Sequence, residues 1–178
     1  ATGLLDQLLP AFTKATGIEV KPIAVGTGKA FELARQGNAD VVKIQTYIAM
    51  QANGVPWNPP MDHPLEKAMR AAGEEFFYRR AGISDFSCAT CHAATGKRIR
   101  ASVLPNASVP EEWTKAISWP AFRVGHDAVR GSQHRVSECV WQMRQAEIVY
   151  GSDAAIAIIS YWTDKARGQP AILPDIKR

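Results

Sequence analysis

The sequence of 178 residues contains no long hydrophobic run. Its longest apolar cluster, residues 154–159, is far shorter than the roughly 18 residues that a membrane-spanning helix needs, so we expect no membrane span. Cysteine is scarce, and three cysteines cannot all pair in internal disulfides. Charge of one sign is not concentrated either: the net charge is +4, and no Lys/Arg stripe indicates nucleic-acid binding. A mildly basic chain fits an anionic small substrate or an acidic partner. The chain opens without a signal peptide, so we expect that any export signal has been removed.

Hydrophobic residues make up 46% of the chain, enough for one packed domain with a short additional segment. Residues 1–43 predict a small α/β segment: a helix ended by Gly17, a strand over 18–25, a helix over 29–36 and a second strand beginning at residues 40–42. Residues 44–178 predict a mainly α domain, with helices over 44–53, from Pro64, over 134–145, and from a Ser152 cap to about Arg167. Residues 93–133 are expected to be rich in loops because they contain three prolines.

The motif that points to chemistry is C-x-x-C-H, formed by Cys88, Cys91 and His92. This spacing is the signature of covalent c-type haem attachment, in which two thiols reach the two vinyl groups of one porphyrin. His92 would then be the proximal ligand of the iron. A thiol-redox motif would be expected near a βαβ pattern, whereas the preceding segment here is helical in pattern. A zinc site would need further ligands, for which Cys139 and one of three histidines, His63, His126 or His134, are candidates without supporting spacing.

The residues around this motif predict a haem domain. Gly73 and Phe77 lie on the helix before it, and Tyr161 and Trp162 lie on the last helix. A glycine where two helices cross lets an aromatic side chain approach the partner backbone closely. This order resembles the class I cytochrome c fold.

The second axial ligand of the iron would separate an electron carrier from an enzyme. A thioether ligand is typical of carriers, whereas a thiolate or an open position favours chemistry. The candidates are Met143, Cys139, His63, His126 and His134. A lone cysteine is usually a small core residue. Arg135, however, precedes Cys139 by four residues, so both can share a helix face, where a guanidinium lowers a thiol pKa and attracts anions.

Residues from about 45 to 178 resemble the C-terminal haem domain of SoxA, the cytochrome subunit of the SoxAX thiosulfate-oxidising complex. The matching segments are residues 73–80 (GEEFFYRR), 87–92 (SCATCH), 96–100 (GKRIR), 119–123 (WPAFR), 134–139 (HRVSEC) and 166–170 (ARGQP). The C-x-x-C-H motif alone is shared by many cytochromes. The ordered set, with Arg-x-x-x-Cys after the haem motif, is more specific.

The resemblance implies one covalent haem c on Cys88 and Cys91, with His92 as the proximal ligand. It implies that Cys139 is the distal ligand and the reactive sulfur, often present as a persulfide, and that Arg135 helps to bind thiosulfate. The implied activity is that of a periplasmic L-cysteine S-thiosulfotransferase, which joins thiosulfate oxidatively to a cysteine of the carrier SoxYZ. Electrons would leave through the haem to the partner cytochrome SoxX. Arg123 and Arg144 are weaker candidates for anion contacts.

Two features depart from this pattern. The chain has a single C-x-x-C-H, so it resembles the mono-haem form of SoxA. Residues 2–42 instead resemble part of a periplasmic tungstate-binding protein, carried by residues 2–6 (TGLLD) and 25–30 (VGTGKA). That family's upstream Thr/Ser-rich anion loop and second lobe are missing, so we expect no working oxyanion site there. The alternative function is a mono-haem electron carrier with Met143 or a histidine on the iron.

Overall fold

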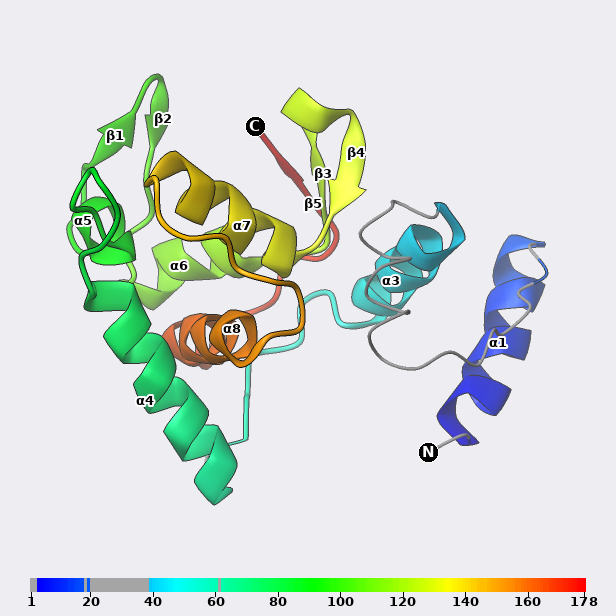
Figure 1. The fold of residues 1–178 in the computed structure, drawn as a ribbon. Helices are drawn as coiled ribbons and strands as arrows, with labels where there is room; N and C mark the ends of the chain where they lie inside the picture. The colour runs from blue at the N-terminus through cyan, green and yellow to red at the C-terminus, as the bar shows by residue number, and fades with distance from the viewer. Residues whose placement is uncertain (1–2, 18, 20–38, 61) are drawn as a thin grey trace.

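The computed structural model describes residues 3–17, 19, 39–60 and 62–178 (Figure 1). The helices are α1 (Gly3–Thr16), α3 (Ala39–Gln51), α4 (Pro64–Tyr78), α5 (Cys88–His92), α6 (Pro110–Ile117), α7 (Ser132–Gln142), α8 (Asp153–Lys165) and the short 3-10 helix η1 (Val124–His126). The strands are β1 (Arg98–Ile99), β2 (Ser102–Val103), β3 (Ala121–Arg123), β4 (Ala128–Arg130) and β5 (Asp175–Lys177). The chain is therefore mainly α with small sheets, and none of the helices in the described part has the length and apolar character needed to cross a membrane.

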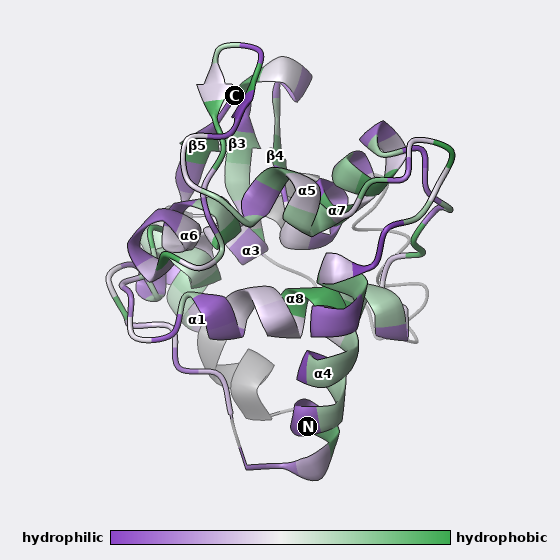
Figure 2. Ribbon diagram, turned by 90° about the vertical axis from the view of Figure 1, so that its left-hand side faces the viewer, coloured by the Kyte–Doolittle hydropathy of each residue, from purple (hydrophilic) through white to green (hydrophobic). Residues whose placement is uncertain are grey.

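Helices α4 and α8 cross in direct backbone contact, and Figure 2 shows α8 lying across α4. A Cβ atom at Gly73 would collide with the carbonyl oxygen of Ala157 and would lie only 2.8 Å from the Cβ of Tyr161. Only glycine leaves room for this approach. The helix crossing predicted from Gly73 and the aromatic residues of the last helix is confirmed.

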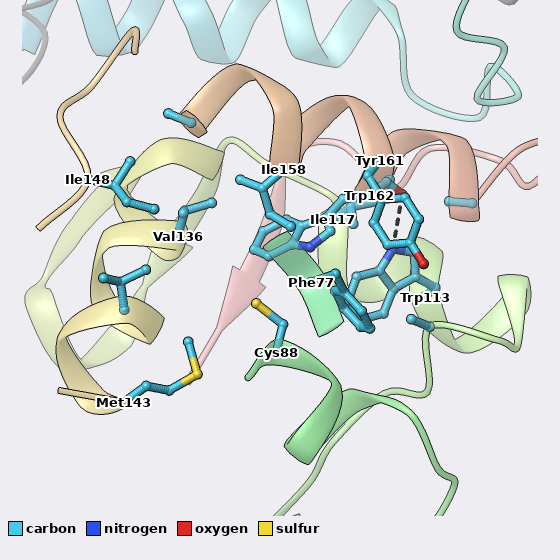
Figure 3. Packing of buried hydrophobic residues seen from close by; sticks show 14 residues of the cluster. Phe77, Cys88, Trp113, Ile117, Val136, Met143, Ile148, Ile158, Tyr161 and Trp162 are labelled. Carbon is cyan, nitrogen blue, oxygen red and sulfur yellow. Dashed lines mark hydrogen bonds between the residues drawn. The ribbon is translucent and has the colours of Figure 1, made fainter. Parts of the chain in front are cut away.

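The main hydrophobic core lies where α4, α5, α6, α7 and α8 meet. Phe77 and Ile158 are completely buried, and Figure 3 shows the Cys88 sulfur pointing into the same cluster. The Trp113 indole Nε1 donates to the carbonyl of Trp162 at 3.0 Å, so the buried indole is satisfied. The start of α5 is thus held against the core through Cys88.

A three-stranded sheet in the order β4-β3-β5 packs beside this core. Strand β3 pairs antiparallel with β4 and parallel with β5. The register places Arg123 opposite Lys177. Two cationic side chains that are 54 positions apart in sequence therefore start from neighbouring strands.

Several sequence predictions are confirmed at the level of elements. Helix α1 ends at Thr16, and Gly17 adopts a φ of +71°, the left-handed conformation that favours glycine. Helix α4 begins at Pro64, and the Ser152 side chain accepts from the backbone N–H of Ala155 at the start of α8. The helix predicted over 134–145 is α7, which begins two residues earlier and ends three residues earlier.

One prediction is wrong, and another holds only in part. Residues 40–42 do not begin a strand, because they belong to α3; β-branched residues favour a strand only when a sheet is available to pack them. Residues 93–133 are less irregular than expected, since they contain α6. The strand predicted over 18–25 and the helix over 29–36 lie almost entirely outside the described residues, so the α/β nature of the N-terminal segment and the division at residue 43 stay predictions.

Candidate functional site

Helix α5 presents the C-x-x-C-H motif as one short helical segment. Its start is stabilised by a capping box, in which the Ser87 hydroxyl accepts from the backbone N–H of Thr90 and the Thr90 hydroxyl accepts from that of Ser87. In a helix, positions separated by three and four residues share a face, so Cys88, Cys91 and His92 are grouped on one side. Cys88 is buried, whereas Cys91 and His92 are partly buried.

The His92 imidazole is oriented as a metal ligand would be. Its Nδ1 lies 2.8 Å from the carbonyl oxygen of Pro105, and because a carbonyl only accepts, Nδ1 carries the proton. Nε2 is therefore the nitrogen with a free lone pair. Burial lowers the pKa of His92, which favours the neutral ring despite the opposing effect of the Pro105 carbonyl. The Trp113 ring meets the imidazole edge to face, with ring centroids 5.3 Å apart.

His92 and Cys139 line the same cavity, which has a volume of about 580 Å³. This volume falls in the usual range of cofactor pockets, roughly 300–1,000 Å³. Its apolar wall includes Leu104, Pro105, Trp113, Ala116, Trp119 and Trp162. An apolar wall that holds an imidazole and a thiol would suit a haem whose iron takes His92 and Cys139 as ligands, while Cys88 and Cys91 are not among the residues that line this cavity.

The polar lining of this cavity is mostly cationic. Five basic residues line it, against the single carboxylate of Glu112: Lys115, Arg123, Arg135, Lys177 and Arg178. The Arg123 Nε atom is buried and makes no hydrogen bond. Such a lining attracts anions, either haem propionates or a small dianion.

Cys139 and Arg135 share the face of α7 that was predicted from their spacing, since both line the cavity. The expected lowering of the thiol pKa is outweighed, because burial raises the pKa of Cys139 more than the Arg135 charge lowers it. Without a metal, Cys139 is therefore a protonated thiol at neutral pH. A metal ion deprotonates a coordinating thiol outright, so an iron bound here would convert Cys139 to the thiolate.

The other candidate axial ligands lie elsewhere. Met143 is 7% exposed and belongs to the main core, where its sulfur faces the Gln145 amide at 3.9 Å. His63 caps α4 by accepting from the Leu65 backbone N–H, and His126 and His134 contact each other. None of these side chains is among the residues that line the cavity.

The zinc and thiol-redox alternatives find no support in the described part of the chain. The group of metal-type side chains found there is His126, His134 and Glu138, which leaves out all three cysteines. Burial raises the pKa of Cys88 to about 12, the opposite of what a reactive C-x-x-C thiol requires.

The two weaker candidates for anion contacts, Arg123 and Arg144, lie in different places. Arg123 lines the cavity, whereas the guanidinium of Arg144 lies over the Trp141 ring, 5.0 Å from its centroid. Residues that the sequence reasoning missed are Pro105, Trp113, Lys177 and Arg178. The residues Pro110, Glu111 and Glu112 form a typical first helical turn. This signal could have predicted the start of α6 and therefore the position of Trp113 in a helix. Lys177 and Arg178 carry no local signal.

Known proteins resemble this chain over most of its length. No protein-family model matches the chain. The SoxA subunit of L-cysteine S-thiosulfotransferase from Hydrogenophilus thermoluteolus is 36% identical over 98% of this chain and 63% of its own length. A SoxA from Hydrogenobacter thermophilus is 34% identical over 74% of this chain and 51% of its own length.

The chain is similar to SoxA subunits over most of its own length. It spans about half to two-thirds of the length of these SoxA relatives. A crystal structure of SoxXA from P. pantotrophus has the same fold, with a TM-score of 0.68 at 22% identity, covering 98% of this chain and 59% of that chain.

A second likeness concerns a shorter part of the chain. A 48-residue stretch is 54% identical to the tungstate-binding protein TupA of Peptoclostridium acidaminophilum, covering 17% of that protein. The H. thermoluteolus SoxA nevertheless aligns with 98% of the chain, so the likeness to SoxA is not confined to residues 45–178.

The burial of His134 leads us to expect that the stability of the protein depends on pH. Burial lowers the pKa of His134, so the unfolded chain takes up this proton more readily than the folded one. The free energy of unfolding is therefore expected to fall as the pH drops below about 6.5. In the haem-loaded protein, urea denaturation between about pH 7.5 and pH 5.5 should show a weaker fall for His134→Gln than for the wild type. An equal fall in the free energy of unfolding for the two proteins would contradict this prediction.

Proposed function

We propose that this chain is the haem-bearing part of an L-cysteine S-thiosulfotransferase in the periplasm. The observation that supports it is that His92 and Cys139 line one cavity, together with Arg123 and Arg135. The SoxA subunits of this enzyme are the relatives that match most of the chain.

In the proposed reaction, a carrier cysteine thiol of a SoxYZ-type protein and thiosulfate form a new S–S bond. The product is the carrier S-thiosulfonate, Cys–S–S–SO₃⁻, with release of one proton and two electrons. Cys88 and Cys91 would hold a haem c, which would accept the electrons and pass them to a SoxX-type cytochrome. In the first step of this proposal, the Cys139 thiol and thiosulfate form Cys139–S–S–SO₃⁻, with loss of one proton and two electrons. The carrier thiol then displaces Cys139 from the sulfane sulfur, which forms the carrier S-thiosulfonate and returns the proton to Cys139.

Several residues that line the cavity have roles in this proposal. Cys139 is the sulfur that takes part in the transfer, and His92 would be a ligand of the haem iron. Arg135 and Arg123 bind the sulfonate oxygens, because a guanidinium matches two such oxygens at once. The apolar wall around Trp113 and Trp162 keeps water from the reacting sulfur atoms.

The test combines the haem-loaded chain with a SoxX-type cytochrome, a SoxYZ-type carrier and an electron acceptor. Mass spectrometry of the carrier should show the gain of one S₂O₃ group, and acceptor reduction should show two electrons for each modified carrier. A carrier that stays unmodified while the haem is reduced by other donors would identify the chain as an electron carrier instead.

Replacement of Arg135 by lysine tests the anion contact. The charge is kept but the planar pair of donors is lost, so the KM for thiosulfate is expected to rise about tenfold with a smaller change in kcat. Arg144→Lys is the matched control, because Arg144 lies over Trp141 and does not line the cavity. Equal KM values in the wild type and Arg135→Lys would remove Arg135 from the substrate site.

A further inference from the structure

Glu138 lies directly before Cys139 in the chain, and its side chain is 13% exposed. One carboxylate oxygen, Oε1, lies 3.2 Å from Nε2 of His126 and 3.7 Å from Nε of Arg123. The other, Oε2, lies 3.4 Å from Nη1 of Arg135. The carboxylate thus stands among donors from three elements, β3, η1 and α7.

A chain of side chains holds Glu138 from the side of His126. Because a carboxylate only accepts, His126 donates to it from Nε2. Nδ1 of His126 lies 3.2 Å from Nε2 of His134, and Nδ1 of His134 lies 2.9 Å from the Tyr150 hydroxyl oxygen. Burial lowers the pKa of His134, which favours its neutral ring.

The two arginines that contact Glu138 face the cavity, but Glu138 itself is not among the lining residues. A carboxylate so close to an anion site opposes anion binding by its charge. Its position has a physical reason if the Glu138 carboxylate holds the two guanidinium groups in a fixed orientation. Arg123 and Arg135 are only 16% and 27% exposed, so each has few other ways to compensate its charge.

The same three side chains, His126, His134 and Glu138, have ligand atoms within 4.8 Å of one another, close enough to share a metal ion. The charges around them oppose this use. Both oxygens of Glu138 already face guanidinium groups, and two fixed positive charges beside the site would repel a further cation. Positioning of the arginines accounts for both guanidinium contacts of Glu138.

We propose that Glu138 is a positioning residue that fixes the Arg123 and Arg135 guanidiniums in the orientation that holds thiosulfate in line with the Cys139 sulfur. This rests on the proposed function. Glu138 touches neither the substrate nor the iron in this assignment. Its charge lowers the attraction for the anion, and its geometry increases the rate of transfer.

The first test measures the order of the two guanidiniums in the haem-loaded chain, independently of any activity. In the reduced protein, the ¹⁵Nε–Hε signals of the arginines are assigned with Arg123→Lys and Arg135→Lys. Glu138→Gln is expected to lower the heteronuclear NOE of both signals. Glu75→Gln, an equal charge change at an exposed position of α4, should leave them unchanged. Unchanged signals in Glu138→Gln would overturn the proposal.

The second test measures transfer to the carrier. Glu138→Gln is expected to lower kcat about tenfold or more while the KM for thiosulfate stays equal or falls, because a misplaced anion is still attracted. Glu138→Asp keeps the charge and should be several-fold faster than Glu138→Gln. An unchanged kcat, or a loss explained by a higher KM, would overturn the proposal. If the wild type transfers nothing, the proposed function fails, and the NMR result still decides the role of Glu138.

Discussion

Replacing Cys139 by alanine is expected to abolish transfer of thiosulfate to the carrier, by about a thousandfold or more, while the haem stays attached. The proposed attachment residues Cys88 and Cys91 lie on α5, whereas Cys139 lies on α7, so the variant would remove the proposed reactive sulfur and leave both attachment cysteines in place. Turnover is measured by carrier mass spectrometry, and attachment by haem absorbance of the denatured protein. The electron paramagnetic resonance spectrum of the oxidised iron should also change, because the variant lacks the proposed sulfur ligand.

The control for this experiment is Met143→Leu, a replacement of similar volume in the buried core. Its iron spectrum and its rate of transfer should match those of the wild type, since Met143 does not line the cavity of His92. Retained transfer in Cys139→Ala, or a changed iron spectrum in Met143→Leu, would refute the assignment of Cys139 and favour the electron-carrier alternative.

Replacing Gly73 by alanine is expected to destabilise the fold by about 3 kcal/mol or more. The added Cβ would collide with the carbonyl group of Ala157, with 2.7 Å to its carbon, and would approach the Cβ of Tyr161 at 2.8 Å. These are backbone and Cβ atoms, which cannot rotate away, so α4 and α8 would have to separate. Urea denaturation of the haem-loaded protein measures the loss directly.

Gly125→Ala is the matched control for this substitution. No heavy atom lies within 4 Å of the Cβ that it would add, and the φ of Gly125 is not in the left-handed region. We expect a change in stability within about 1 kcal/mol. If Gly73→Ala were as mild as Gly125→Ala, the close crossing of α4 and α8 would not be essential to the fold.

Much of this fold was predictable because its signals are local. The Gly17 stop, the Pro64 start and the Ser152 cap each depend on backbone geometry within a few residues, and each lies where the pattern indicated. Residues 40–42 show the limit of such signals. Their β-branched side chains indicated a strand, but the choice between strand and helix depends on a neighbouring strand that the local sequence does not describe.

The candidate site shows the same difference between local sequence signals and tertiary packing. The grouping of Cys88, Cys91 and His92, and the shared face of Arg135 and Cys139, follow from helical spacing alone. The effect of Arg135 on the thiol was misjudged, because burial depends on what packs against α7 and not on the spacing within it.

The sequence by itself determined that the chain carries a haem-attachment motif, that its fold is mainly helical, and which cysteine and arginine share a helix face. Tertiary structure decided that His92 and Cys139 line one cavity, that Pro105 orients the imidazole, and that Lys177 is opposite Arg123. Spacing along a helix is a property of the local backbone. A cavity exists only after distant segments have packed, because its walls are set by side chains from many elements at once.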